Sequence, residues 1–289
     1  MIGIRQFCGI IGIAAGLAAS VPTHAQPVMK DRTAEARPYS LERSAVFDVE
    51  AAGGESYAVM AAWPEGDAPA SGWPVLYLLD GEDNFAIFAL TARRLARARE
   101  RSGIEAGIVV GIAAGPLARR VYDYTPPVAG YAIAPGRPAA GLPTGGAEPF
   151  LDMLETRVMA QVRRRWPVDT HRETLAGHSF GGLLAIHAML TRPAMVDQVV
   201  AVSPSFWFGD GLLMREAAAA AAGTGPIHIF TGGKEQGAAV AAEAFATARR
   251  TRPGAGPIHA VELAGQSHGG TMLAAATQTI AAAFGTKVP

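Results

Sequence analysis

The chain has very little cysteine and little charge. Its one cysteine is Cys8, inside an apolar run near the amino terminus, so the rest of the chain can form neither a disulfide bond nor a thiolate site. Charged residues make up 17% of the 289 residues, and the 25 Lys and Arg balance the 25 Asp and Glu. There is no basic run and no alternation of basic and aromatic residues. We therefore expect no nucleic-acid partner.

The amino-terminal residues have the pattern of an export signal. Arg5 supplies a positive charge, residues 8–21 form an apolar stretch shorter than a bilayer span, and small residues precede a cleavage site after Ala25. No charged stop-transfer flank follows, which argues against an uncleaved anchor. We expect residues 1–25 to be a cleaved signal peptide and the mature protein to be periplasmic or secreted. No later segment is long enough to span a membrane, so we expect none after cleavage.

Beyond the signal, apolar runs typical of strands alternate with helical patterns. Residues 26–43 are polar and predict a flexible segment, and residues 44–289 predict a single domain. We expect strands at 44–50, 57–63, 73–79, 106–112, 174–177, 198–202, 226–231 and 258–263, and helices at 85–101, 148–165, 181–191, 212–222, 238–250 and 271–284. This order predicts an α/β fold with a mostly parallel, doubly wound sheet. Residues 113–146 form a long Gly/Pro-rich segment, which predicts a lid-like or substrate-binding insertion.

The run 177–182 (GHSFGG) places a serine between a predicted strand and a predicted helix. In a G-x-S-x-G turn the glycines permit close backbone approach, and the bend exposes the serine hydroxyl at the carboxyl end of the sheet. The same pattern without this setting would be an ordinary glycine-rich turn. The strand-turn-helix setting favours Ser179 as a nucleophile at the start of a helix.

A serine nucleophile needs a base, and His268 is the candidate that elimination leaves. The other histidines are better explained as signal, packing or remote residues: His24, His171, His178, His187, His228 and His259. His178 adjoins the serine and is expected to face away from it. His268 lies in a predicted loop after the last strand, where α/β-hydrolases place the base, and it keeps the chain order serine, acid, histidine.

The acid and the oxyanion hole are less strongly specified. Glu235 follows the strand 226–231 at the usual position of an acid that orients the imidazole, Asp210 is the alternative, and a Ser-His pair without a carboxylate is also open. Backbone N–H groups of Phe180 and Glu82 are expected to bind the oxyanion, with Gly81 as the alternative to Glu82.

These segments together resemble the bacterial Putative esterase family of α/β-hydrolases, over residues 44–284. The resemblance rests on residues 78–81 (LLDG), 120–126 (RVYDYTP), 177–182 (GHSFGG), 203–207 (SPSFW) and 267–269 (SHG). The segment RVYDYTP is similar to the branch that hydrolyses cyclic catecholate trilactones, the siderophore esterases. Some members of that branch work with a Ser-His dyad.

The resemblance also implies substrate-binding residues. Arg120 would meet an anionic group such as a catecholate, or else would pair with Asp123 and shape the loop. Phe206 and Trp207 would line an acyl or aromatic pocket, or else would pack as core.

The function implied is an exported serine esterase that hydrolyses carboxylic esters of small molecules through an acyl-enzyme. We expect no cofactor and no metal, because no paired His or His/Cys spacing and no cofactor loop is present. A monomer is favoured. An acyltransferase using the same serine and a non-catalytic binding protein on the same scaffold are the alternatives.

Overall fold

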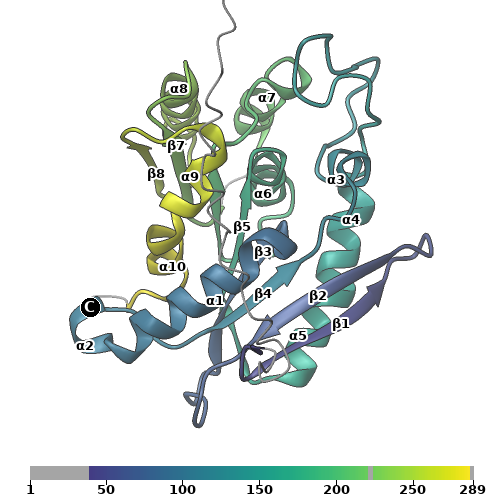
Figure 1. The fold of residues 1–289 in the computed structure, drawn as a ribbon. Helices are drawn as coiled ribbons and strands as arrows, with labels where there is room; N and C mark the ends of the chain where they lie inside the picture. Colours follow the sequence, from purple (N-terminus) through teal and green to yellow (C-terminus); the bar gives the residue numbers. More distant parts are fainter. Residues whose placement is uncertain (1–38, 221–223, 287–289) are drawn as a thin grey trace, which may run out of the picture. The chain divides into compact units, whose positions relative to one another are not determined.

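A central sheet organises the protein in the computed structural model, which describes residues 39–220 and 224–286. The predicted signal peptide and most of the predicted flexible segment lie outside the described residues. Within the described chain, the strands form an eight-stranded sheet in the order β1-β2-β4-β3-β5-β6-β7-β8 (Figure 1). The strands are β1 Ser44–Glu50, β2 Ser56–Ala62, β3 Trp73–Leu79, β4 Ile108–Ile112, β5 Val168–His178, β6 Gln198–Val202, β7 Ile227–Gly232 and β8 Ile258–Leu263.

Most of the sheet is parallel. β1 pairs with β2 and β2 with β4 in antiparallel fashion, and every pair from β4 through β3 to β8 is parallel. Strand β3 has the burial typical of a parallel sheet: its residues 74–79 are all buried, as expected of a strand covered by helices on both faces. The predicted α/β class with a mostly parallel sheet is confirmed.

Helices cover both faces of the sheet (Figure 1). They are α1 Gly81–Arg97, α2 Arg99–Ser102, α3 Leu117–Asp123, α4 Ala147–Met153, the π-helical turn η2 Leu154–Met159, α5 Ala160–Arg165, α6 Phe180–Thr191, the 3₁₀ turn η3 Phe208–Asp210, α7 Leu212–Ala219, α8 Ala238–Arg250, α9 His268–Ala274 and α10 Ala276–Phe284. Phe88, Met272 and Ile280 place α1, α9 and α10 against one apolar core. Phe150, Leu183 and Phe245 place α4, α6 and α8 against the other core. No helix in the described ranges is long and apolar enough to cross a bilayer.

The segment 113–146, expected to be a lid-like insertion, begins with a helix. Helix α3 lies in the first part of the segment. The residues after α3 form a loop whose two ends lie close together. The Gly145 N–H donates to the Thr125 carbonyl (3.1 Å), the Ala147 N–H donates to the same carbonyl (3.2 Å), and the Gly146 N–H donates to the Tyr122 carbonyl (2.8 Å). Residues 126–144 therefore form a loop whose two ends are joined by backbone hydrogen bonds.

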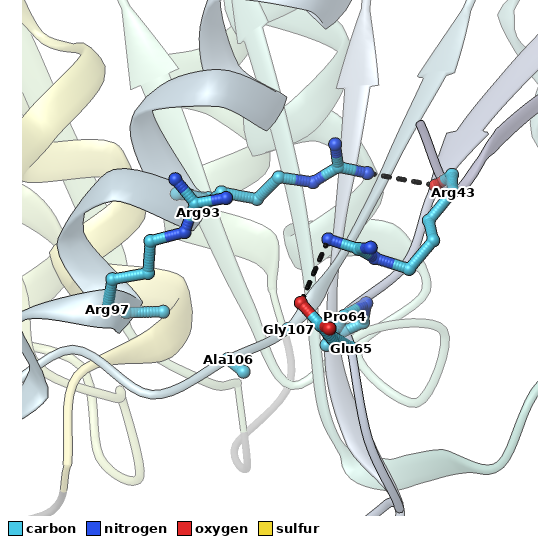
Figure 2. A pocket seen from close by; sticks show the side chains of 9 residues that line it. Arg43, Pro64, Glu65, Arg93, Arg97, Ala106 and Gly107 are labelled. Carbon is cyan, nitrogen blue, oxygen red and sulfur yellow. Dashed lines mark hydrogen bonds and ion pairs between the residues drawn. The ribbon is translucent and has the colours of Figure 1, made fainter. Parts of the chain in front are cut away.

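A cavity of about 180 Å³ lies at the amino ends of the parallel strands, where α1 meets the antiparallel hairpin. Figure 2 shows Arg93 and Arg97 extending from α1, with the Arg93 guanidinium donating to the Arg43 carbonyl (2.9 Å) and Arg43 paired with Glu65 (3.4 Å). These contacts fasten α1 to the start of β1 and the end of β2. The cavity is at the opposite end of the sheet from Ser179.

His187 joins three helices on one face of the sheet. It lies on α6, with Nδ1 2.7 Å from Glu216 Oε1 of α7 and Nε2 2.9 Å from Glu148 Oε1 of α4. Burial alone would lower the pKa of His187, but hydrogen bonds and charge attraction from the two carboxylates outweigh it, so the pKa is raised. The imidazolium can donate to both carboxylates at once, which agrees with the expected packing role of His187.

This arrangement predicts a pH-dependent stability. A histidine whose folded-state pKa is raised contributes fully below its ordinary pKa of about 6.5, and the contribution is lost as pH rises through the folded pKa. We expect the free energy of unfolding in urea to fall between about pH 6 and about pH 9 by more in the wild type than in His187→Gln. If the free energy of unfolding changed equally with pH in the two proteins, the His187 contacts would make no contribution to the pH dependence of stability.

Candidate active site

Ser179 occupies a sharp turn between β5 and α6. Its backbone angles are φ 59 and ψ −113, a positive-φ conformation that a non-glycine residue adopts only where the surrounding structure imposes it. The close packing of the turn explains the glycines: a Cβ on Gly177 would lie 2.5 Å from the backbone of Gly181. The turn places Ser179 at the carboxyl end of β5 and directly before the amino end of α6, as its sequence setting indicated.

Three side chains from separate segments of the chain form a continuous series of hydrogen bonds. His268 Nε2 is 3.1 Å from Ser179 Oγ, and His268 Nδ1 is 2.7 Å from Glu235 Oε2. Neutral His268 with its proton on Nδ1 donates to Glu235 and presents Nε2 as an acceptor for the serine hydroxyl. His268 is the first residue of α9 rather than a loop residue, because this helix begins three residues earlier than its periodicity predicted.

The Glu235 carboxylate is held by several donors. Its Oε1 accepts hydrogen bonds from the Ser203 hydroxyl (2.5 Å), the Gly232 N–H (2.7 Å) and the Thr271 hydroxyl (3.1 Å). Burial alone would raise the pKa of Glu235, but hydrogen bonds from Ser203, His268 and Gly232 outweigh it and lower the pKa. The group is therefore kept ionised, as a carboxylate facing an imidazole must be.

Ser203 was not singled out as a site residue from the sequence. Its φ is 44, so the chain turns sharply at the end of β6 and directs the hydroxyl to Glu235. A serine followed by proline directly after a buried strand was the available signal. Asp210, the alternative acid, is an exposed residue at the end of η3. It lines a different cavity, from which His268 is absent.

His178 does not face away from the site. Its ring packs against the His268 ring, with centroids 4.5 Å apart, and its Nε2–H donates to the His268 carbonyl (2.8 Å). Burial and the neighbouring His268 lower the pKa of His178 to about 4, so the ring is neutral near pH 7. The expectation failed because the residue before the serine lies at the strand end, next to the helix that begins with His268.

The expected oxyanion donors lie at the starts of two helices. Phe180 is the first residue of α6, and Gly81 and Glu82 begin α1, so their N–H groups have no partner within their helices. No acceptor for these three groups is found in the described part of the chain. The Glu82 carboxylate points elsewhere and accepts from the Ala114 N–H (3.0 Å).

Arg120 lies on α3 and lines the same cavity as Ser179 and His268, with a volume of about 500 Å³. Its guanidinium pairs with Asp80 rather than with Asp123, which pairs with Arg119. Arg119 binds the Asp123 carboxylate four residues along α3, and Arg120 instead reaches Asp80 at the end of β3.

Phe206 and Trp207 follow β6 and contribute to both packing and cavity walls. Phe206 packs on Phe245 (centroids 5.6 Å apart) and Trp207 on Phe180 (5.7 Å), and both line a cavity of about 270 Å³ that also touches His268. Trp207 also lines a larger hollow of about 640 Å³ beneath the loop 126–144. Arg137 and Trp207 therefore line both cavities.

A family model described as "Putative esterase" matches residues 51–255. The chain belongs to this family. The resemblance seen in its motifs is thereby confirmed.

The chain is also similar to curated proteins that are named siderophore esterases. It is 38% identical over 196 residues to a siderophore triacetylfusarinine C esterase of Aspergillus fumigatus, covering 63% of this chain and 62% of that protein. It is 31% identical over 167 residues to a ferri-bacillibactin esterase of Bacillus subtilis, covering 56% and 57%. The chain thus spans about three fifths of the length of these curated relatives.

Solved structures show the same fold. The siderophore hydrolase EstB from Aspergillus nidulans matches with a TM-score of 0.72 at 27% identity, covering 88% of this chain and 99% of that one. The BES protein from Bacillus cereus matches with a TM-score of 0.77 at 22% identity, covering 86% and 98%. The predicted α/β-hydrolase fold is confirmed.

Proposed function

We propose that the protein is a carboxylic ester hydrolase that works through an acyl-enzyme on Ser179. The observation that supports this most is the hydrogen-bonded chain Ser179–His268–Glu235, at 3.1 Å and 2.7 Å, at the carboxyl end of the sheet. Nucleophile, base and orienting acid lie within the distances that acyl transfer requires. The named esterase relatives support the same activity.

The proposed reaction has two halves. Ser179 Oγ attacks the ester carbonyl carbon as its proton passes to His268 Nε2, and the carbonyl oxygen becomes an oxyanion held by backbone N–H groups of Phe180 and of Glu82 or Gly81. His268 then gives the proton to the departing alkoxide. In the second half His268 takes a proton from water, the hydroxide attacks the acyl carbon, and the proton returns to Ser179. Glu235 stabilises the imidazolium in both halves.

The proposed substrate is an ester of an iron-binding siderophore. The relatives named above act on such esters. In this chain, the cavity beneath the loop 126–144 is lined by Arg137, Trp207 and Arg215, with the Arg137 guanidinium 5.3 Å from the Trp207 ring, and the two guanidinium groups outnumber the one carboxylate there, Asp210. Cationic and aromatic groups together suit a substrate that is itself aromatic and anionic, as a ferric catecholate is. This favours a catecholate over a neutral ferric hydroxamate.

The test compares three esters at equal concentration: a ferric catecholate trilactone, a ferric hydroxamate ester and p-nitrophenyl butyrate. We expect hydrolysis of all three by the wild type and the highest kcat/KM for the catecholate. Arg137→Ala should lower kcat/KM about tenfold for the catecholate and leave p-nitrophenyl butyrate within about twofold, because only the first substrate presents negative charge.

Two outcomes would contradict these assignments. Equal or higher kcat/KM for the hydroxamate would overturn the catecholate preference. Transfer of the acyl group to an added alcohol, with little free acid formed, would identify an acyltransferase instead of a hydrolase. Ser179→Ala prepared in the same way controls for contaminating esterases.

We also propose that the protein is exported, with cleavage after Ala25 and one domain over residues 44–289. The support is the charge, length and small-residue pattern of residues 1–25. Amino-terminal sequencing of protein recovered from the periplasm or medium should begin at Gln26.

A further inference from the structure

Arg120 joins the ends of two neighbouring strands. Its Nε–H and one Nη–H donate to the two carboxylate oxygens of Asp80 (2.5 and 2.8 Å), which follows β3. The Nη–H also reaches the His178 carbonyl (3.1 Å), the last residue of β5. A guanidinium forms such a paired contact with fixed geometry, unlike the single contact of an ammonium group. Arg120 is thus a cross-link between the two turns that flank the cavity.

Asp80 is held in an unusual conformation at the same point. Its φ is 54 and its ψ 49, in the left-handed region, and it is 6% exposed. Its N–H donates to the hydroxyl of the buried Tyr124 (3.2 Å), whose ring lies 5.3 Å from the Arg120 guanidinium. Asp80 therefore has both its side chain and its backbone fixed by one short segment, Arg120 to Tyr124. Nothing else in the described chain binds its carboxylate.

The two turns held by Arg120 carry the two halves of the expected oxyanion hole. Asp80 precedes the free N–H groups of Gly81 and Glu82, and His178 precedes Ser179 and the free N–H of Phe180. An oxyanion hole is effective only when its donors are fixed before the charge develops. A displacement of one turn relative to the other would separate the donors and lower the rate without weakening substrate binding.

We propose that Arg120 and Asp80, supported by Tyr124, act as positioning residues that set the distance between the two halves of the oxyanion hole. In this role Arg120 acts on the reaction through the backbone and needs no contact with an anionic substrate. The proposal rests on the proposed function, and it replaces the substrate-binding role expected for Arg120 from the family resemblance.

The test uses Arg120→Gln, Asp80→Asn and the double variant, assayed on the small neutral ester p-nitrophenyl acetate. We expect each single variant to lower kcat by about 10²-fold, the effect of losing one oxyanion donor, with KM within about threefold. The double variant should be no slower than the singles, because both remove the same cross-link. Reaction of Ser179 with a fluorophosphonate, which also develops negative oxygen, should slow by a similar factor.

Arg119→Gln is the matched control. Arg119 is the adjacent residue on α3 and pairs with Asp123 (2.8 Å), outside the cross-link. We expect its kcat to remain within about threefold of the wild type, because Arg119 contacts neither Asp80 nor His178. Thermal unfolding of every variant shows whether it is folded at the assay temperature. Arg120→Lys keeps the charge but not the paired contact, and it should give an intermediate rate. It also keeps the proposal testable if Arg120→Gln does not fold.

The outcomes separate the possibilities. A loss confined to anionic esters, with p-nitrophenyl acetate unaffected, would overturn the positioning role and restore substrate binding. An equal loss in Arg119→Gln would show general damage to α3 and would also overturn it. A wild type that neither hydrolyses esters nor reacts with the fluorophosphonate would instead contradict the proposed function itself.

Discussion

Replacing Ser179 with alanine is expected to lower kcat for ester hydrolysis by about 10⁴-fold or more and to abolish covalent labelling by a fluorophosphonate. The Ser179 oxygen is the atom that attacks the carbonyl, and among the described residues the Ser179 hydroxyl is the one hydrogen-bond partner of His268 Nε2, at 3.1 Å. The residual rate should equal that of a Ser179→Ala/His268→Ala double variant, because the two residues act as one unit.

Ser205 supplies the control for this result. Its hydroxyl is 3.4 Å from Ser179 Oγ and is the neighbouring serine in the structure. We expect Ser205→Ala to keep the label on Ser179, as shown by mass spectrometry of the tryptic peptides. Full hydrolysis by Ser179→Ala, or labelling of Ser205 in the wild type, would remove Ser179 as the nucleophile.

Glu235→Gln has the second largest expected effect, a loss in kcat of about 10²- to 10⁴-fold with little change in KM. The amide keeps the size of the side chain but removes the charge that stabilises the imidazolium. It can also donate to His268 Nδ1 and so favour the wrong tautomer, which leaves the proton on Nε2. Steady-state kinetics with p-nitrophenyl butyrate measure both parameters.

A matched pair of variants tests whether the contact to His268 is responsible. Ser203→Ala removes a donor to Glu235 Oε1 but leaves the His268 contact at Oε2 in place, so we expect a loss of about tenfold or less. Asp210→Asn should have wild-type kinetics with p-nitrophenyl butyrate. A Glu235→Gln rate near that of the wild type would make the site a Ser-His dyad.

Much of this arrangement is readable in the sequence because it depends on short-range patterns. The buried β3 is a continuous apolar run, and the turn at Ser179 requires glycine where Gly177 meets Gly181. His268 and Glu235 are candidates because they follow successive strands, and the carboxyl ends of parallel strands share one edge of the sheet, but the same rule left Asp210 open as the acid.

The side-chain contacts that position the site residues could not be predicted from short-range sequence patterns. The partner of Arg120 is Asp80, 40 positions away, and no local pattern chooses it over Asp123. Similarly, the ring of His178 meets His268, 90 positions later, only because β5 ends beside α9. Such pairings depend on the relative placement of whole elements, which periodicity and turn chemistry do not determine.

The joined ends of the loop 126–144 have a consequence for how this protein can diverge. Because Thr125 accepts from the backbone of both Gly145 and Ala147, the two ends of the loop stay joined, while Ile133 between them packs in the apolar core. An insertion, deletion or exchange that keeps Ile133 and the joined ends changes the wall of the hollow beside Trp207 and leaves the core packing in place. The substrate preference can therefore change during evolution through substitutions in this loop, while the residues that carry out the reaction stay the same.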